Sequence, residues 1–325
     1  MTITSRSIIF GVAMFFACAA PVAAAQKIRA CYSAVAGNMT PLWLAKEKGF
    51  FAKYGQDVDL TLIQAGPTAA AAMISGDVPF CMFTGPTVIQ SRLSGSDLVI
   101  LAGITNTFDF TFFGAKDLKS IDQLKGKKVG ISRFGSATDF AVRVLLQKHG
   151  LKPGQDVALL QVGLTTERVA ALEAGSVQAT LVNVVFTPTM RKKGFAELAE
   201  RIDAEYQHLA LVSSESYIRQ SRDQVRSFVR ALMEGVKYYR SNRRETIEVM
   251  SKYLRTGNPE VLNATYDWYL GSIPQKPYPT LNGIAFILKD LAATDARARG
   301  ADPKSFVDAS FVQELDGSGF FAGAR

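Results

Sequence analysis

A weak internal repeat constrains the fold of this 325-residue chain more than any other feature. Strand-like runs at 27–32 and 128–132 are each followed by a glycine-containing loop and then by a helical pattern, over 41–54 and 136–149. The two loop glycines, at positions 37 and 135, lie 98 residues apart. Two copies of one strand–helix plan predict two similar α/β lobes. Two alternatives stay open from this pattern alone: chance similarity between ordinary α/β units, and one larger doubly wound sheet.

The segments that follow repeat as well. A helical run at 68–73 leads to Gly76 and a strand, and a helical run at 166–172 leads to Gly175 and a strand, so these glycines lie 99 residues apart. In α/β proteins, ligand sites form beyond the carboxyl ends of the parallel strands, where the helices begin. Two facing lobes would therefore line one cleft with these loops.

The chain is predicted to cross between the lobes twice. A phenylalanine-rich extended run over 107–113 leaves the first lobe, and 208–212 is the natural return. Later helical patterns, which we interpret as a cover on the first lobe, fall at 223–240, 244–253, 258–270 and 281–293. The predicted domains are 26–107 for the first part of lobe 1, 108–208 for lobe 2, and 209–325 for the return to lobe 1 and the C-terminal helices.

Residues 1–25 have the pattern of a cleavable signal peptide. Arg6 precedes a 13-residue apolar stretch over 8–20, and alanines at 23–25 form a small-residue cleavage site. A stretch of 13 residues is well short of the roughly 20 that span a bilayer as a helix. We therefore expect a protein exported to the periplasm. A lipid anchor on Cys18 is the alternative.

Two cysteines follow the signal peptide, Cys31 and Cys81, each inside an apolar strand-like run. Since free cysteine is among the most buried residue types, we predict two core thiols in preference to a disulfide. The chain has two histidines, His149 and His208, and neither falls in a predicted cleft loop. No metal-ligand spacing or cofactor fingerprint occurs, so no metal and no cofactor are expected.

Basic residues concentrate in one stretch. The formal net charge is +8, and residues 219–255, with ten Lys or Arg and four Asp or Glu, carry +6 of it. Within this stretch Arg222, Arg226 and Arg230 repeat every four residues opposite an apolar helix face. We interpret them as a solvated basic face, with docking of a partner protein as the alternative. Nucleic acid is not an expected partner, because no aromatic platform accompanies the basic stripe. A monomer is expected, because no heptad seam is present.

Four segments carry a family resemblance: 42–51 (LWLAKEKGFF), 71–78 (AAMISGDV), 121–129 (IDQLKGKKV) and 170–177 (AALEAGSV). Over 27–270 the chain resembles the nitrate/sulfonate/taurine-type periplasmic solute-binding proteins of ABC importers, a family that includes binders of thiamine-pyrimidine precursors. One departure is Gln178-Ala179, where the family usually has Asp-Ala. The resemblance implies a type II periplasmic-binding fold: two α/β lobes joined by two crossing strands, here with a helical C-terminal cover. It also implies a small-molecule ligand and transient docking on an ABC permease.

A binder of this kind closes on its ligand, so contacts are expected from both lobes. The candidate ligand-binding residues are Asn38, Met39, Gln64, Thr68, Thr84, Asn106, Phe108, Arg133, Ser136, Thr138 and Asn183. Residues 133–138 give the most specific prediction, because a helix N-terminus, a glycine and an arginine together can bind an anion. The simpler interpretation is that Ser136 caps its helix and Arg133 is a surface residue.

Phenylalanines near strand ends could wall the cleft: Phe83, Phe108, Phe134 and Phe186. They favour an organic anion, sulfonate- or carboxylate-like, with a flat or apolar body over bare nitrate. The alternatives are a thiamine-pyrimidine-type heterocycle on the same fold, an enzyme resembling fungal pyrimidine synthases, and an exported sensor. The enzyme is disfavoured, because the sequence lacks a nucleophile motif and a phosphate-binding loop.

Overall fold

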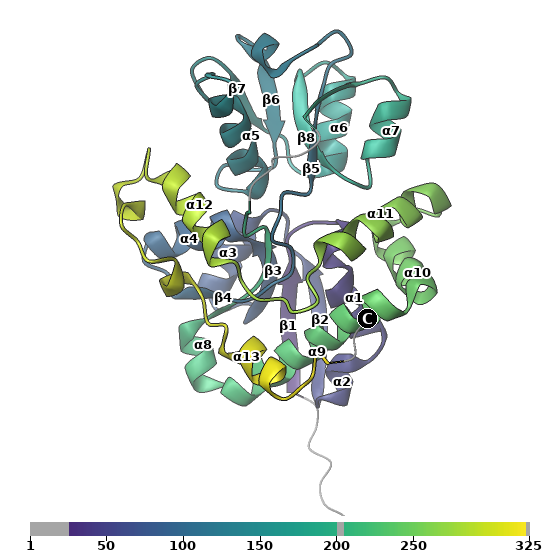
Figure 1. Cartoon of the computed structure of the whole chain (residues 1–325), viewed down its shortest axis with the longest axis vertical. Helices are drawn as coiled ribbons and strands as arrows, with labels where there is room; N and C mark the ends of the chain where they lie inside the picture. The colour runs from purple at the N-terminus through teal and green to yellow at the C-terminus, as the bar shows by residue number, and fades with distance from the viewer. Residues whose placement is uncertain (1–25, 200–204, 323–325) are drawn as a thin grey trace, which may run out of the picture.

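The computed structural model describes residues 26–199 and 205–322 and arranges them around two five-stranded sheets (Figure 1). The first sheet has the order β2-β1-β3-β10-β4, built from β1 (Gln26–Tyr32), β2 (Gln56–Leu62), β3 (Phe80–Thr84), β4 (Leu98–Gly103) and β10 (Leu209–Ser214). The second has the order β7-β6-β8-β5-β9, built from β5 (Phe110–Gly114), β6 (Lys128–Ile131), β7 (Ala158–Gln161), β8 (Ala179–Asn183) and β9 (Ala196–Ala199). The sequence repeat is confirmed, since both sheets follow one plan.

Helices cover both faces of the two sheets. The first sheet carries α1 (Thr40–Glu47), α2 (Phe50–Lys53), α3 (Gly66–Ile74), α4 (Gly85–Leu93), α8 (Glu215–Gln220), α9 (Arg222–Ser241), α10 (Arg243–Leu254), α11 (Pro259–Ser272), α12 (Leu281–Leu291) and α13 (Ser310–Gly317). The second carries α5 (Ala137–Lys148), α6 (Thr165–Glu173) and α7 (Thr187–Lys192). We call each sheet with its helices a lobe. The helix expected over 41–54 is divided into α1 and α2, because Gly49 adopts φ 72 between them.

The fourth strand of each sheet arrives from the other lobe. β5 follows β4 of the first sheet but pairs antiparallel with β8 and β9, and β10 follows β9 but pairs antiparallel with β3 and β4. Where the two connections pass each other, Thr107 and Glu205 form an antiparallel bridge, and Tyr206 N donates to Asn106 O at 3.0 Å. The two crossings predicted from sequence are thus present. The domain limits at 107/108 and 208/209 remain predictions.

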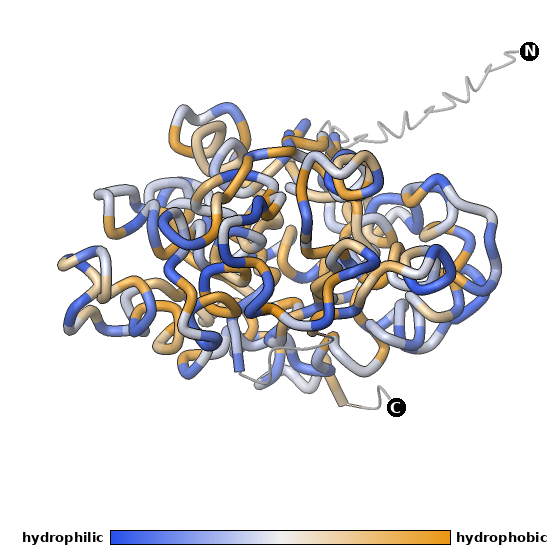
Figure 2. The backbone as a smooth tube through the Cα atoms, turned by 90° about the horizontal axis from the view of Figure 1, so that it is seen from above, coloured by the Kyte–Doolittle hydropathy of each residue, from blue (hydrophilic) through white to orange (hydrophobic). Residues whose placement is uncertain are grey.

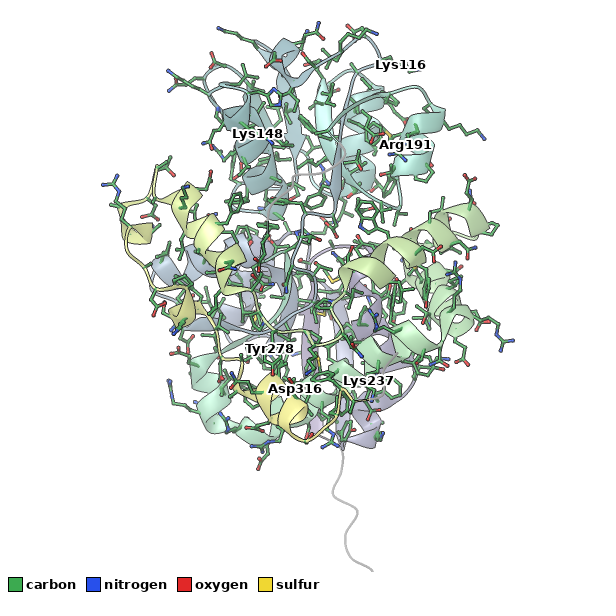
Figure 3. All side chains as sticks on the ribbon, in the orientation of Figure 1. Lys116, Lys148, Arg191, Lys237, Tyr278 and Asp316 are labelled. Carbon is green, nitrogen blue, oxygen red and sulfur yellow. A yellow bond between two sulfur atoms is a disulfide. The ribbon has the colours of Figure 1, made fainter. Side chains whose placement is uncertain are left out.

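The C-terminal helices pack on the first lobe, as predicted. α9 approaches α1 so closely that a Cβ on Gly235 would lie 2.1 Å from the carbonyl oxygen of Pro41. A segment that the sequence did not predict as helical, α13, then packs against α9. Lys276 Nζ and Tyr278 Oη lie 2.8 and 3.0 Å from the Asp316 carboxylate, which fastens α13 to the turn before α12 (Figure 3).

The basic face of α9 is largely exposed, as expected, and it forms surface ion pairs with α13. Arg222 Nη2 and Arg226 Nε lie 3.1 and 2.8 Å from the carboxylate of Glu314 on α13. The Arg230 guanidinium lies 5.4 Å from the centre of the Tyr54 ring.

Hydrophobic and hydrophilic positions alternate along the chain (Figure 2). No helix within the described ranges has the length and apolar character needed to cross a bilayer. The predicted signal peptide lies outside the described residues.

Cys31 and Cys81 form a disulfide, so the prediction of two free thiols was wrong. The two residues are register partners on the parallel neighbours β1 and β3, with their Cα atoms 4.4 Å apart. The sequence showed that both lie on buried strands, but it did not show that these strands are adjacent. The bond closes a loop of 50 residues within the first lobe.

Replacing both cysteines, Cys31→Ala with Cys81→Ala, is expected to lower the free energy of unfolding by about 2–4 kcal/mol, because the disulfide restricts the unfolded chain. Urea unfolding followed by circular dichroism measures the change, with reduced wild-type protein as the matched control. A finding of two reactive thiols in unreduced, denatured protein would contradict the bond itself.

Candidate ligand-binding site

A cavity of about 1240 Å³ opens between the two lobes. Its walls are the loops that follow β1, β2 and β3 in the first lobe and β6, β7 and β8 in the second. These are carboxyl ends of strands, which is where the repeat placed the cleft. The crossing segments supply its base, and the connection between α10 and α11 supplies a further wall.

Eight predicted ligand residues line the cavity: Asn38, Met39, Gln64, Thr84, Arg133, Ser136, Thr138 and Asn183. Three do not. Thr68 is exposed in the first turn of α3. Asn106 Nδ2 donates instead to the carbonyl oxygen of Tyr278 at 3.1 Å. Phe108 is buried and stacks on Tyr206, with ring centres 3.8 Å apart. Asn106 and Phe108 therefore lie in the crossing region, outside the lining of the cavity.

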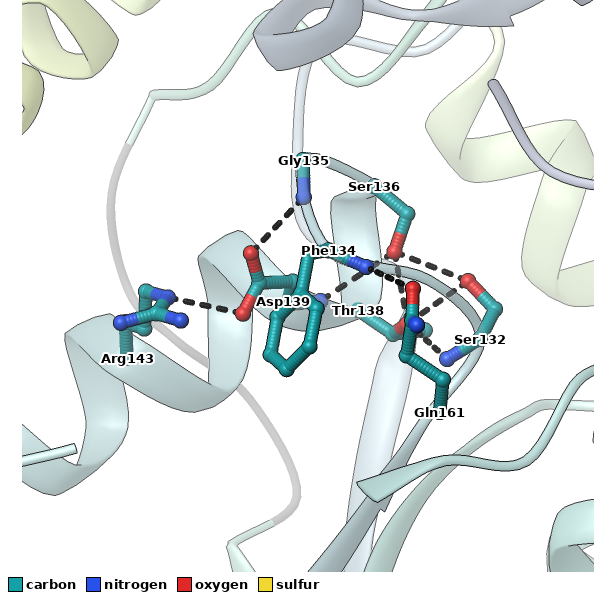
Figure 4. Close-up of polar contacts among 8 residues, drawn as sticks. All are labelled: Ser132, Phe134, Gly135, Ser136, Thr138, Asp139, Arg143 and Gln161. Carbon is teal, nitrogen blue, oxygen red and sulfur yellow. Dashed lines mark hydrogen bonds and ion pairs between the residues drawn. The ribbon is translucent and has the colours of Figure 1, made fainter. Parts of the chain in front are cut away.

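The start of α5 holds a compact polar group (Figure 4). The hydroxyls of Ser132, Ser136 and Thr138 lie 2.8–3.0 Å from one another, and Ser136 Oγ accepts from Asp139 N at 3.3 Å. The Asp139 carboxylate in turn accepts from Gly135 N at 2.8 Å. Ser136 thus caps α5, as the simpler interpretation of the sequence expected, while the Asp139 carboxylate holds the glycine before the helix.

The aromatic walls differ from the predicted ones. Of the four phenylalanines, only Phe186 lines the cavity. Phe83 and Phe108 are core residues, whereas Phe134 is 48% exposed and lies outside the cavity.

Two tyrosines that the sequence analysis missed line the first-lobe side, Tyr32 and Tyr253. Tyr253 stacks on Trp43, with ring centres 4.6 Å apart and planes 7° apart. Tyr32 ends a predicted strand and could have been found by that rule. Tyr253 lies in the last turn of α10, and no local pattern marks it.

A buried carboxylate, Asp109, forms the base of the cavity. Asn38 Nδ2 and the Tyr269 hydroxyl donate to its Oδ2 at 2.7 and 2.8 Å. His208 Nε2 lies 2.9 Å from its Oδ1. Asp109 and His208 both line the cavity, so the expectation that neither histidine lies at the cleft was wrong for His208. The group joins both crossing segments to the loop before α1 and to α11.

This arrangement fixes the orientation of the Asn38 amide. A carboxylate only accepts hydrogen bonds, so the amide nitrogen must face Asp109. The amide oxygen, Oδ1, is then left buried without a partner among the described residues. Since an unpaired buried acceptor costs free energy, a ligand that donates a hydrogen bond there would be favoured.

Cations dominate the charged lining: Arg133, Arg168, Lys252 and Arg255 against Asp109 and Glu167. Arg168 is 3% exposed, and burial lowers its pKa to about 10. The sequence analysis noticed its segment as part of the repeat but gave it no role.

Two cavity residues have strained backbones. Ala65 and Arg255 adopt φ 66 and φ 52, and they are the non-glycine residues with positive φ in the described part of the chain. Such conformations cost free energy and concentrate at functional sites. Within 26–199 and 205–322, no three His, Cys, Asp or Glu side chains are placed to share a metal ion.

Residues 36–246 match the family described as NMT1/THI5 like, which is more than half of the chain. The chain belongs to the NMT1/THI5-like family. Among curated relatives, the putative binding protein YtlA of Bacillus subtilis is 24% identical over 251 residues, 74% of this chain and 75% of YtlA. The formylaminopyrimidine-binding protein of Halalkalibacterium halodurans is 26% identical over 219 residues, 65% of each chain.

Solved structures share the fold. A protein from Bordetella bronchiseptica RB50 superposes with a TM-score of 0.81 at 20% identity, covering 90% of this chain and 97% of that one. The periplasmic aliphatic sulphonate-binding protein SsuA from Escherichia coli gives a TM-score of 0.67 at 18% identity, covering 87% and 92%. The resemblance inferred from four short segments is therefore confirmed, and so is the periplasmic-binding fold.

Replacing Asp109 with alanine should lower the free energy of unfolding by about 3 kcal/mol, because it removes the acceptor of two buried donors and the partner of His208. Urea unfolding measures the change. Asp117→Ala, at an exposed position of the second lobe, is the control and should change it by less than about 0.5 kcal/mol. Equal effects of the two variants would show that the group does not stabilise the fold.

Proposed function

We propose that this protein is the extracytoplasmic solute-binding subunit of an ABC importer, and that it captures a small organic anion in the interlobe cavity without chemical change. The observation that carries the proposal is a cavity between two hinged lobes whose walls combine unpaired guanidinium groups with aromatic rings. Family membership and the fold of SsuA support the transport role. Export to the periplasm and transient docking on a permease are part of the proposal.

Charge pairing favours an anion. Lys252 is neutralised by Glu47, whose carboxylate oxygen lies 2.8 Å from its Nζ. Arg133, Arg168 and Arg255 have no carboxylate within 4.0 Å among the described residues. The cavity therefore keeps an excess of positive charge, which attracts acids and disfavours cations.

Size favours an organic solute over a bare oxyanion. Small-molecule sites usually measure about 300–1,000 Å³, and this cavity, at about 1240 Å³, stands above that range. Nitrate would fill only a small part of it. A ligand that contacts both lobes stabilises the closed arrangement by its differential affinity for that state.

A pyrimidine-type heterocycle is the second candidate. Oδ1 of Asn38 and Oδ1 of Asn183, which have no partner within the described ranges, are acceptors suited to ring amino groups. One relative is named for formylaminopyrimidine. A catalytic role would have to use the Asp109–His208 pair at the base of the cavity. Conversion of a bound ligand by purified protein would favour that role over transport.

Calorimetric titration tests the proposal. The panel is nitrate, taurine, alkyl sulfonates, aromatic carboxylates and pyrimidines, and we expect one organic acid to bind with one-to-one stoichiometry. A thermal-shift screen reports the same event, since ligand at 100 times its Kd adds about 2.7 kcal/mol of stability. Tight nitrate binding without any organic ligand would overturn the proposal.

Transport is tested separately. Deleting the gene should abolish uptake of the bound acid, whereas loss of a transcriptional response with uptake intact would indicate a sensor. Size-exclusion chromatography of the protein with and without that acid checks the expected monomer.

A further inference from the structure

Arg168 is a buried cation that forms no ion pair among the described residues, although the Glu167 carboxylate attracts it from a longer distance. Its Nη1 donates to Gly163 O at 2.5 Å, and its Nη2 donates to Thr165 Oγ1 and Leu181 O, both at 3.1 Å. All three acceptors are neutral, and the buried Nε has no partner among the described residues. No described carboxylate lies within 4.0 Å of the guanidinium.

Burying such a charge is costly unless an anion compensates it. Since Arg168 lines the cavity, an acidic ligand would supply the missing charge where water screens it least. The other unpaired guanidinium groups, on Arg133 and Arg255, belong to exposed residues, so solvent and salt weaken their attraction. The start of α5 also lines the cavity, and there Ser136 Oγ already accepts from Asp139 N.

The neighbours of Arg168 can also hydrogen-bond to the acidic group of such a ligand. Thr165 Oγ1 accepts from Arg168 and, at 3.5 Å, from Asn183 Nδ2. A hydroxyl that accepts twice still has one hydrogen to donate, and this one has no acceptor among the described residues. Both Thr165 and Asn183 line the cavity beside Arg168.

The opposite wall is aromatic. Tyr32 and Tyr253 line the first-lobe side, and Tyr253 is held flat by the Trp43 ring stacked against it. A planar ring gains most from such a wall by stacking. The buried Arg168 thus lines the second-lobe side of the cavity, and the stacked Tyr253 lines the first-lobe side.

We propose that the ligand is a ring-bearing carboxylic or sulfonic acid, held with its acidic group at Arg168 and Thr165 and its ring against Tyr253. Arg168 is the residue that selects acids over neutral analogues. This inference rests on the proposed function, which requires only that some organic anion binds.

The test compares acids with their neutral amides. Benzoate, nicotinate and benzenesulfonate are titrated calorimetrically against wild-type protein, alongside benzamide, nicotinamide and benzenesulfonamide. Arg168→Gln is expected to weaken binding of the best acid by about 10- to 100-fold, because it removes a hydrogen bond to a charged group. The affinity for the corresponding amide should stay within about 3-fold of the wild-type value. Arg244→Gln, at an exposed helix position of the first lobe, is the matched control and should change neither.

The outcomes separate the two proposals. If no organic acid binds to wild-type protein, the proposed function fails. If acids bind but Arg168→Gln keeps the ratio of acid to amide affinity, or if wild-type protein binds the amide equally well, only the present inference fails. The present inference also fails if Arg133→Gln lowers the ratio of acid to amide affinity more than Arg168→Gln does.

A structure of wild-type protein with 4-bromobenzoate decides the question even if Arg168→Gln does not fold. We expect the carboxylate within hydrogen-bond distance of Arg168 or Thr165 and the bromine on the Tyr253 side. A carboxylate bound at Arg133 or at the start of α5 would refute the proposal.

Discussion

The buried carboxylate of Asp109 is the interaction on which the arrangement of the cavity depends. It lies on the segment that leads from the first sheet to the second, and it contacts the returning segment through His208, the loop before α1 through Asn38 and the cover through Tyr269. Because a buried carboxylate needs all of its partners, these four parts of the chain are held in one geometry where the lobes meet. The base of the cavity is thereby fixed, while the walls above it belong to separate lobes.

The exchange of strands explains how the two lobes are joined. Each sheet receives its fourth strand from the connection to the other lobe, so each connection is anchored in a sheet on both sides. Between the anchors only short segments cross, paired at Thr107 and Glu205. Closure by a hinge needs a few such residues that absorb the change in backbone angles, and the sheets themselves can stay rigid.

Charge is distributed unequally over the cavity, and burial decides which charges matter. The exposed Arg133 satisfied the sequence pattern of an anion site, yet the Ser136 hydroxyl already caps the adjacent helix. In the described part of the chain, Arg168 has only neutral hydrogen-bond acceptors, and it lies in a less hydrated environment. Electrostatic attraction grows as the local dielectric falls, so the less conspicuous arginine has the stronger reason to bind an acid.

The sequence by itself determined the two-lobed plan, the positions of the cleft loops and most of the C-terminal helices. Hydrophobic periodicity, glycines and caps act over a few residues, and they can be read without knowing what lies opposite. Asn38 and Asn183 were predicted near the cleft in this way, and both line the cavity. Tertiary structure alone decided that Cys31 lies beside Cys81, that His208 meets Asp109 and that Arg168 is buried in the cavity wall. These contacts join residues far apart in the chain, or depend on how the lobes pack, and strand order sets them rather than any local pattern.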